Sequence, residues 1–158
     1  MYESGDTATE NAILAAVLLP GKTKINLASS NYMVQDLCYF LARTGAKIKG
    51  IGTTKLEITG VKKLKPISYP IMPDPIESMA FISIAITTAS KLKITACLLE
   101  FLSLELEKLR VMGQTIKISK IYKSANRQFD LVDIEIMPAK LKALPDKIYG
   151  RPFPGLNI

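Results

Sequence analysis

The chain contains no histidine and only two cysteines, Cys38 and Cys97, among its 158 residues. Without histidine it lacks the commonest general base near neutral pH and the commonest zinc ligand. The two cysteines give neither a disulfide framework nor the spacing of a metal site. Each falls on an apolar face or junction of a predicted element, so both are expected to be buried and unreactive. The sequence predicts no metal, no cofactor and no histidine-based catalysis.

Long apolar runs and a leader sequence are also absent. The longest uncharged helical stretch, residues 78–90, is far shorter than the roughly 20 residues that span a bilayer. The first five residues lack the basic start and the apolar run of a signal peptide. We therefore expect a cytoplasmic protein that makes no contact with a membrane.

Positive charge is in excess, with a net charge of +7. Many lysines occupy alternate positions of predicted strands, as in the pairs Lys22 and Lys24, and Lys91 and Lys93. A period of two places such residues on one face of a strand. These lysines are predicted to cover solvent-facing sheet surfaces, and no nucleic-acid partner is expected.

One pattern occurs twice along the chain. Glu10 is matched by Glu77, Lys24 by Lys93 and Gly45 by Gly113, at spacings of 67, 69 and 68 residues. These spacings exceed the roughly 20 to 50 residues of solenoid repeats. The sequence therefore predicts two copies of one folding unit.

Each copy has the pattern helix–strand–helix–strand–strand. With a strand taken from the preceding segment, each copy becomes a βαβαββ module, which implies an α/β (α+β) protein with mixed sheets and buried helices. We expect modules at residues 1–67 and 68–137, and an irregular tail at 138–158 that leads to a missing third module. Helices are predicted at residues 8–19, 32–43, 76–89 and 98–112, and strands at 22–28, 46–50, 55–59, 91–97, 115–122 and 129–137.

Two helix starts are predicted to carry capping boxes, formed by Thr7 with Glu10 and by Asp74 with Glu77. Two carboxylates three residues apart, as in the second pair, could also serve acid–base chemistry. Because the box occurs in both copies, capping is the favoured interpretation.

A set of short segments along nearly the whole chain has the order and spacing of one enzyme family. These segments are Ala8–Leu14, Val34–Leu41, Gly45–Ile48, Gly52, Ile58–Val61, Met72–Asp74, Ile76–Glu77 and Arg151–Gly155. On these segments, the chain resembles the enolpyruvyl transferases, and among them those that act on UDP-N-acetylglucosamine.

The resemblance implies an inside-out α/β barrel of repeated βαβαββ modules, two of which are present. It also implies transfer of the enolpyruvyl group of phosphoenolpyruvate to UDP-N-acetylglucosamine, in peptidoglycan precursor synthesis. The family's catalytic residues match no position here, so no catalytic residue is assigned and this chain alone is expected to be inactive. Its expected partners are the missing catalytic half or a second copy of itself.

In the family, the loop before the segment matching Ala8–Leu14 helps to hold the uridine nucleotide. The resemblance therefore implies a role in binding the UDP moiety for Ser4, Gly5, Asp6 and Thr7. A helix N-terminus attracts phosphate, although Asp6 adds a negative charge there. The alternative interpretation is a plain helix cap.

Two other functions stay open. The chain could belong to another enzyme of the same fold, such as an EPSP synthase. It could also be a non-catalytic module that self-associates to cover exposed apolar edges.

Overall fold

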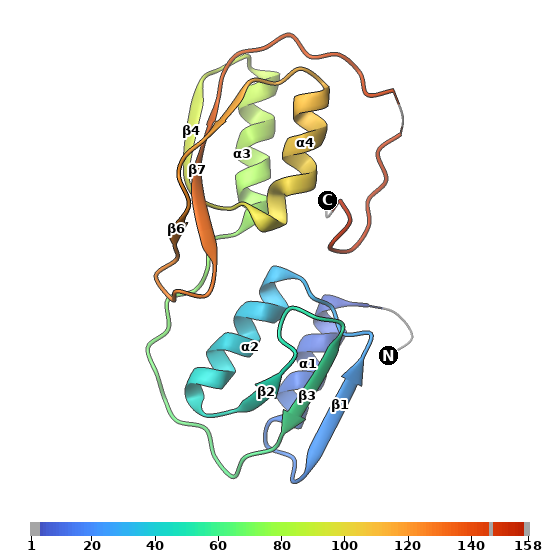
Figure 1. Cartoon of the computed structure of the whole chain (residues 1–158), viewed down its shortest axis with the longest axis vertical. Helices are drawn as coiled ribbons and strands as arrows, with labels where there is room; N and C mark the ends of the chain where they lie inside the picture. Colours follow the sequence, from blue (N-terminus) through green and yellow to red (C-terminus); the bar gives the residue numbers. More distant parts are fainter. Residues whose placement is uncertain (1–3, 146, 157–158) are drawn as a thin grey trace. The chain divides into compact units, whose positions relative to one another are not determined.

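The structure is a computed structural model that describes residues 4–145 and 147–156. The chain divides into two compact units (Figure 1). Unit 1 contains the described residues up to Pro70 together with Pro152–Pro154, and unit 2 contains Ile71–Arg151 and the residues from Gly155 onward. Each unit has its own sheet and its own apolar core.

Unit 1 consists of two helices packed on a three-stranded sheet. The central strand is β3, and β1 and β2 both pair with it in antiparallel orientation. β1 and β2 therefore run in the same direction, and α2 connects them as in a split βαβ unit. The bounds are α1 Asp6–Ala16, β1 Lys22–Asn26, α2 Tyr32–Thr44, β2 Lys47–Lys49 and β3 Lys55–Thr59.

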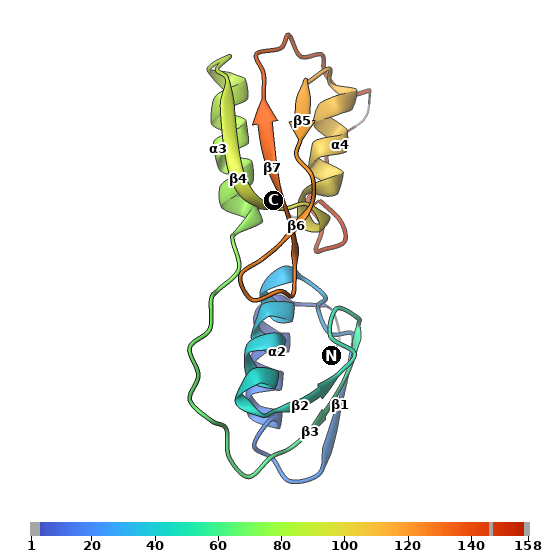
Figure 2. The ribbon, with the colours of Figure 1, turned by 60° about the vertical axis from the view of Figure 1, so that its left-hand side comes forward.

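Alternation along these strands separates the core from the solvent. Ile25 of β1 and Leu56 of β3 are buried, whereas Lys24 and Lys55, which directly precede them, point outward and are exposed. Apolar residues of both helices join the same cluster, so α1 and α2 cover one face of the sheet (Figure 2). The prediction of solvent-facing lysines on half-buried strands is confirmed for this sheet.

Unit 2 has the same order of elements with two additions. β4 and β5 flank the central β7 in antiparallel orientation, and the two-residue β6 also pairs with β7. A single 3-10 turn, η1, precedes α4. The core joins α3, α4 and the sheet through residues such as Ile82, Leu106 and Ile134. The bounds are α3 Pro75–Thr87, β4 Leu92–Leu98, η1 Glu100–Leu102, α4 Ser103–Val111, β5 Ile116–Ile118, β6 Tyr122–Lys123 and β7 Asp130–Ile136.

The second helix of each unit ends in the same way. Gly45 follows α2 with φ of 109°, and Gly113 stands just beyond the end of α4 with φ of 97°. These left-handed conformations suit glycine, which has no Cβ to clash. The backbone N–H of each glycine donates to a carbonyl of the last turn, at 3.1 Å and 2.9 Å respectively. Both helix ends are therefore where the sequence predicts them.

Two expectations about the sheets are wrong. The strand expected before the second unit is absent, because residues 60–74 contain no strand. Pro66, Pro70 and Pro73 lie in this connection, and each removes a backbone donor that a strand would need. Every strand pairing among the described residues is antiparallel, so the sheets are not mixed.

Two expectations about the helices also need correction. The helix predicted at 98–112 begins as η1, and regular α-helix starts only at Ser103. Helix α3 is not buried on all sides, since Ile76, Phe81 and Ile84 are 48%, 54% and 57% exposed. A helix layered on a single sheet buries one stripe, whatever the composition of its other faces.

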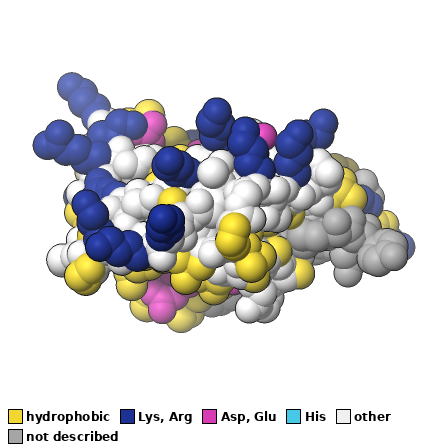
Figure 3. Space-filling model, turned by 90° about the horizontal axis from the view of Figure 1, so that it is seen from below, with side chains coloured by type: hydrophobic (Ala, Val, Ile, Leu, Met, Phe, Trp, Pro, Cys, Tyr) yellow, Lys and Arg dark blue, Asp and Glu magenta, His cyan; other side chains and the backbone are white. Residues whose placement is uncertain are grey.

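Residues 138–145 and 147–156 contain no helix or strand. None of the described helices is long and apolar enough to cross a membrane. Lysine and arginine side chains clearly outnumber acidic ones on the face shown in Figure 3, in keeping with the net charge.

Candidate substrate-binding site

The four residues assigned to nucleotide binding, Ser4, Gly5, Asp6 and Thr7, lie at the N-terminal end of α1. Gly5 is the N-cap residue, with extended backbone (φ −122°, ψ 135°), and the helix begins at Asp6. The first turn of a helix presents backbone N–H groups that have no acceptor inside the helix. These groups and the helix dipole favour an anion at this end.

The capping box expected from Thr7 and Glu10 is wrong. Thr7 is the second residue of the helix, and no side chain caps the start at Gly5. The Thr9 hydroxyl instead donates to the Gly5 carbonyl at 2.7 Å. Glycine is itself tolerated as an N-cap, so the helix begins earlier than a threonine cap at position 7 would allow.

The cap predicted for the second unit is confirmed. Asp74 Oδ1 accepts a hydrogen bond from the Ile76 N–H at 2.7 Å, and Pro75 occupies the first helical position. Proline is suited to this position because its missing N–H would have had no partner. Glu77 is exposed in the first turn of the helix. Asp74 therefore has a clear structural role.

The Asp6 carboxylate is held by the loop that precedes α2. Ser29 Oγ donates to Asp6 Oδ1, and Asn31 Nδ2 donates to Asp6 Oδ2 at 2.9 Å. Hydrogen bonds to a charged carboxylate are stronger than those between neutral groups, and the helix dipole adds to them. The negative charge of Asp6 is thus engaged by donors of unit 1 itself.

Three buried polar residues connect the starts of α1 and α2. The Ser29 N–H donates to Thr9 Oγ1 at 2.9 Å, and the Asn31 N–H donates to Ser29 Oγ at 3.1 Å. Asn31 is also the N-cap of α2, because its Oδ1 accepts from the Tyr32 N–H at 2.9 Å. Thr9 and Asn31 are 0% and 1% exposed. Buried polar groups are stable only when paired, so this network fixes the two helix starts relative to each other.

The turn between β2 and β3 lies beside the same loop. Gln35 Nε2 donates to the Ser30 carbonyl at 2.8 Å. Gly52 has φ of 80°, and a Cβ on it would lie 3.3 Å from Gln35 Oε1. The hairpin turn, the loop of residues 29–31 and the start of α1 therefore form one edge of unit 1.

Sequence reasoning missed Ser29, Asn31 and Gln35 as parts of this edge. The sequence predicts only a helix that begins at residue 32, and this start is confirmed, with Asn31 as its N-cap. The burial of these three residues was not foreseen, because polar side chains are mostly exposed in proteins. The available clue was a run of cap-forming residues shortly after a half-buried strand.

Glu10 and the two cysteines have pKa values raised by burial. Burial raises the pKa of Glu10, and the nearby Asp6 raises it further. Burial raises the pKa of Cys38 to about 12 and raises that of Cys97 as well, so both stay protonated at neutral pH. Both thiols are buried, as predicted. No group of three histidine, cysteine, aspartate or glutamate residues in the described part of the chain could hold a metal ion.

The sequence profile of the family described as EPSP synthase (3-phosphoshikimate 1-carboxyvinyltransferase) matches residues 2–149. The chain therefore belongs to this family of carboxyvinyltransferases. The resemblance to the enolpyruvyl transferases stated from the sequence is confirmed.

Within the family, the chain is similar to proteins named UDP-N-acetylglucosamine 1-carboxyvinyltransferase. The one from Treponema denticola is 50% identical over 93 residues, which cover 59% of this chain and 22% of that protein. The one from Parasynechococcus marenigrum is 38% identical over 149 residues, 94% of this chain and 31% of that protein. The one from Coxiella burnetii is 36% identical over 148 residues, which cover 94% of this chain and 32% of that protein. The chain spans less than a third of the length of these relatives.

Solved structures give the same fold. An EPSP synthase from Acinetobacter baumannii superposes on 90% of this chain and 32% of its own, with a TM-score of 0.66 and 18% sequence identity. A second structure of EPSP synthase from that organism gives a TM-score of 0.65 at 20% identity. At such low identity the likeness concerns the fold alone.

Proposed function

We propose that the chain is part of a UDP-N-acetylglucosamine 1-carboxyvinyltransferase of the cytoplasm. The observation that carries this proposal is the 36–38% identity to proteins of that name over 94% of the chain. The whole enzyme would transfer the enolpyruvyl group of phosphoenolpyruvate to the 3′-hydroxyl of UDP-N-acetylglucosamine and release phosphate. This reaction belongs to the synthesis of peptidoglycan precursors.

Units 1 and 2 would be two repeated modules of an inside-out α/β barrel, with boundaries at residues 1–67 and 68–137. Their common strand order, with the last strand of each unit at the centre of its sheet, and their glycine-terminated second helix support a shared origin. Residues 138–158 would lead toward a third module.

The start of α1 would contribute to the site for the UDP moiety. Backbone N–H groups of Ser4 to Thr7 offer donors for a diphosphate at the positive end of the helix dipole. The bonds from Ser29 and Asn31 to Asp6 support this role, because they draw its carboxylate toward the protein and away from an incoming phosphate. Phosphoenolpyruvate and the catalytic groups would be held by other parts of the enzyme, and this chain alone would be inactive.

A chimeric enzyme tests the reaction. The matching segment of the Coxiella burnetii relative is replaced by residues 1–158. Phosphate release from phosphoenolpyruvate is then measured with UDP-N-acetylglucosamine or with 3-phosphoshikimate as the acceptor. Release that depends on UDP-N-acetylglucosamine is expected. A folded chimera that is inactive with this acceptor would contradict the proposal.

A second candidate is an EPSP synthase reaction on 3-phosphoshikimate. The description of the family profile and the likeness to the Acinetobacter baumannii structures favour it. Phosphate release with 3-phosphoshikimate in the same chimera would establish this alternative. Its support is weaker because the structural likeness comes with only 18–20% identity.

A further inference from the structure

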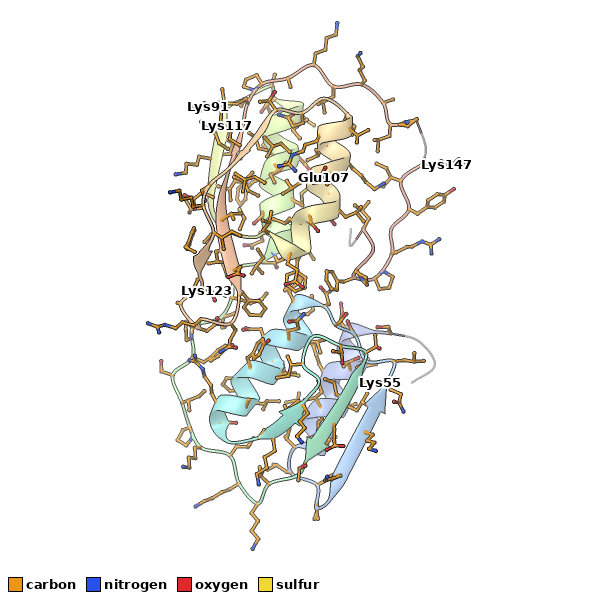
Figure 4. All side chains as sticks on the ribbon, viewed as in Figure 1. Lys55, Lys91, Glu107, Lys117, Lys123 and Lys147 are labelled. Atoms are coloured by element: carbon orange, nitrogen blue, oxygen red, sulfur yellow. The ribbon has the colours of Figure 1, made fainter. Side chains whose placement is uncertain are left out.

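One face of unit 1 carries a dense array of lysines. It is the side of the sheet that points away from α1 and α2. Lys24 and Lys49 flank Glu57 in the strand register, and Lys22 and Lys47 flank Thr59 one row further along. Lys55 stands two residues before Glu57 on the central strand and so faces the same way (Figure 4). The basic face is defined as Lys22, Lys24, Lys47, Lys49, Lys55 and Glu57.

The positive charge of the basic face is largely unopposed. All five lysines are exposed. Glu57 lies 3.6 Å from Lys22, measured between the carboxylate oxygen and Nζ. The other four lysines make no ion pair with any residue that the structure describes. Five lysines against one glutamate leave an excess of four positive charges on a surface three strands wide.

Unit 2 provides an internal comparison. Lys93 and Lys117 flank Glu135 just as Lys24 and Lys49 flank Glu57. Two residues before the central glutamate, however, unit 2 carries Asp133 where unit 1 carries Lys55.

Two lysines on this side of the second sheet form ion pairs. Lys93 contacts Asp133 at 3.0 Å and Lys91 contacts Glu135 at 2.7 Å. The two faces therefore share a geometry and differ in charge balance.

The residue types on the basic face indicate which class of anionic partner it can bind. Its remaining outward residues are Asn26 and Thr59, so the described strands place no arginine and no aromatic ring there. Bidentate recognition of phosphate and stacking of nucleobases both need such residues. Lysines repeat about 7 Å apart along a strand and about 10 Å apart across the sheet. An array of ammonium groups spread over one face of a sheet suits an extended, densely charged layer whose anions can move laterally.

We propose that the basic face docks on the surface of a bilayer that contains anionic phospholipids. With no exposed apolar side chain on the face, the contact is electrostatic, reversible and sensitive to salt. This inference replaces the expectation of no membrane contact and does not depend on the proposed carboxyvinyl transfer.

Sedimentation of the chain with vesicles tests the proposal. The vesicles contain phosphatidylglycerol and phosphatidylcholine in equal parts, or phosphatidylcholine alone. Binding is expected only to the anionic vesicles at low salt, and it should be lost near 1 M salt, where the Debye length is about 3 Å. Absence of binding to anionic vesicles at low salt would overturn the proposal.

Matched variants locate the contact. K24Q/K49Q removes two charges from the basic face, and K93Q/K117Q removes the equivalent two from unit 2. Each lysine near an anionic membrane surface raises the affinity for the membrane about fivefold. K24Q/K49Q should therefore weaken vesicle binding about 25-fold, whereas K93Q/K117Q should change it less than about threefold. Equal losses in the two variants would show that net charge, rather than this face, drives binding. Tighter binding to duplex DNA than to anionic vesicles at the same salt would also overturn the proposal.

Discussion

Leu27 and Ala96 share the same left-handed backbone conformation, with φ of 60°, at equivalent places in the two units. Leu27 directly follows β1, and Ala96 lies in β4 at the register shift between Ile94 and Cys97. For a residue other than glycine this conformation costs about 1–2 kcal/mol. The strain occurs where the chain leaves the first strand of each unit toward its second helix. Both units therefore change direction at this point through the same strained conformation.

Replacing Ala96 with glycine should therefore stabilise the protein. Glycine removes the strain but loses more chain entropy on folding, so the expected net gain is about 0.5–1 kcal/mol. The matched control is A80G on the exposed side of α3, which should cost about 1 kcal/mol of helix stability. Urea denaturation of both variants measures the difference, and a loss for A96G comparable to that for A80G would contradict the account.

The bonds from Ser29 and Asn31 to Asp6 should contribute substantially to the stability of unit 1. Asp6→Ala leaves the side-chain donors of two buried residues without this acceptor, so we expect a loss of about 2 kcal/mol. The control is Asp130→Ala, because Asp130 is exposed and pairs with Lys123 at 2.5 Å in an ion pair of a type that contributes about 0–1 kcal/mol. If both variants unfold at the same urea concentration, the network at the start of α1 is not stabilising.

Acid should destabilise unit 2 through Asp133 and Glu135. The hydrogen bond from Lys93, followed by that from Tyr122, lowers the pKa of Asp133, and the bond from Lys91 lowers the pKa of Glu135. The folded state binds these protons less tightly than the unfolded chain does. The two carboxylates therefore make their full contribution to the free energy of unfolding at neutral pH. It should fall as the pH drops below about 4–5, toward and through the lowered pKa values.

The variants D133N and K93Q test this pH dependence. Each removes one partner of the Lys93–Asp133 pair, which is joined at 3.0 Å. The dependence of the urea midpoint on pH between about 5 and 2 should be shallower in both than in the parent chain. An unchanged slope in both variants would show that the pair does not determine the acid sensitivity.

Local rules predicted most elements of the fold but not the tertiary contacts. The ends at Gly45 and Gly113 followed from glycine chemistry, and the cap at Asp74 followed from its place before a proline. The sequence could not show that Asp6, rather than Thr7, would interact with the next loop, because its partners lie 23 and 25 residues away. The exposed side of α3 was mispredicted for a related reason, since composition does not specify how many faces of a helix are covered.

The exposed side of α3 should make the chain self-associate. Ile76, Phe81 and Ile84 present apolar surface to solvent, and contiguous surface of this kind favours association. F81D should weaken association at least tenfold, because a carboxylate would be desolvated in the contact. Light scattering over a range of concentrations measures this, with T54D at an exposed position of unit 1 as a control. A parent chain that stays monomeric at high concentration would contradict the prediction.

Titration of the chain with UDP-N-acetylglucosamine, followed by backbone amide NMR and by heat release, tests the proposed function most directly. We expect shifts concentrated at residues 4–11 and 29–31, where the starts of α1 and α2 meet. UMP, which lacks the diphosphate, should produce smaller shifts at residues 4–7. No binding at millimolar ligand, or shifts confined to unit 2, would contradict a UDP site at the start of α1.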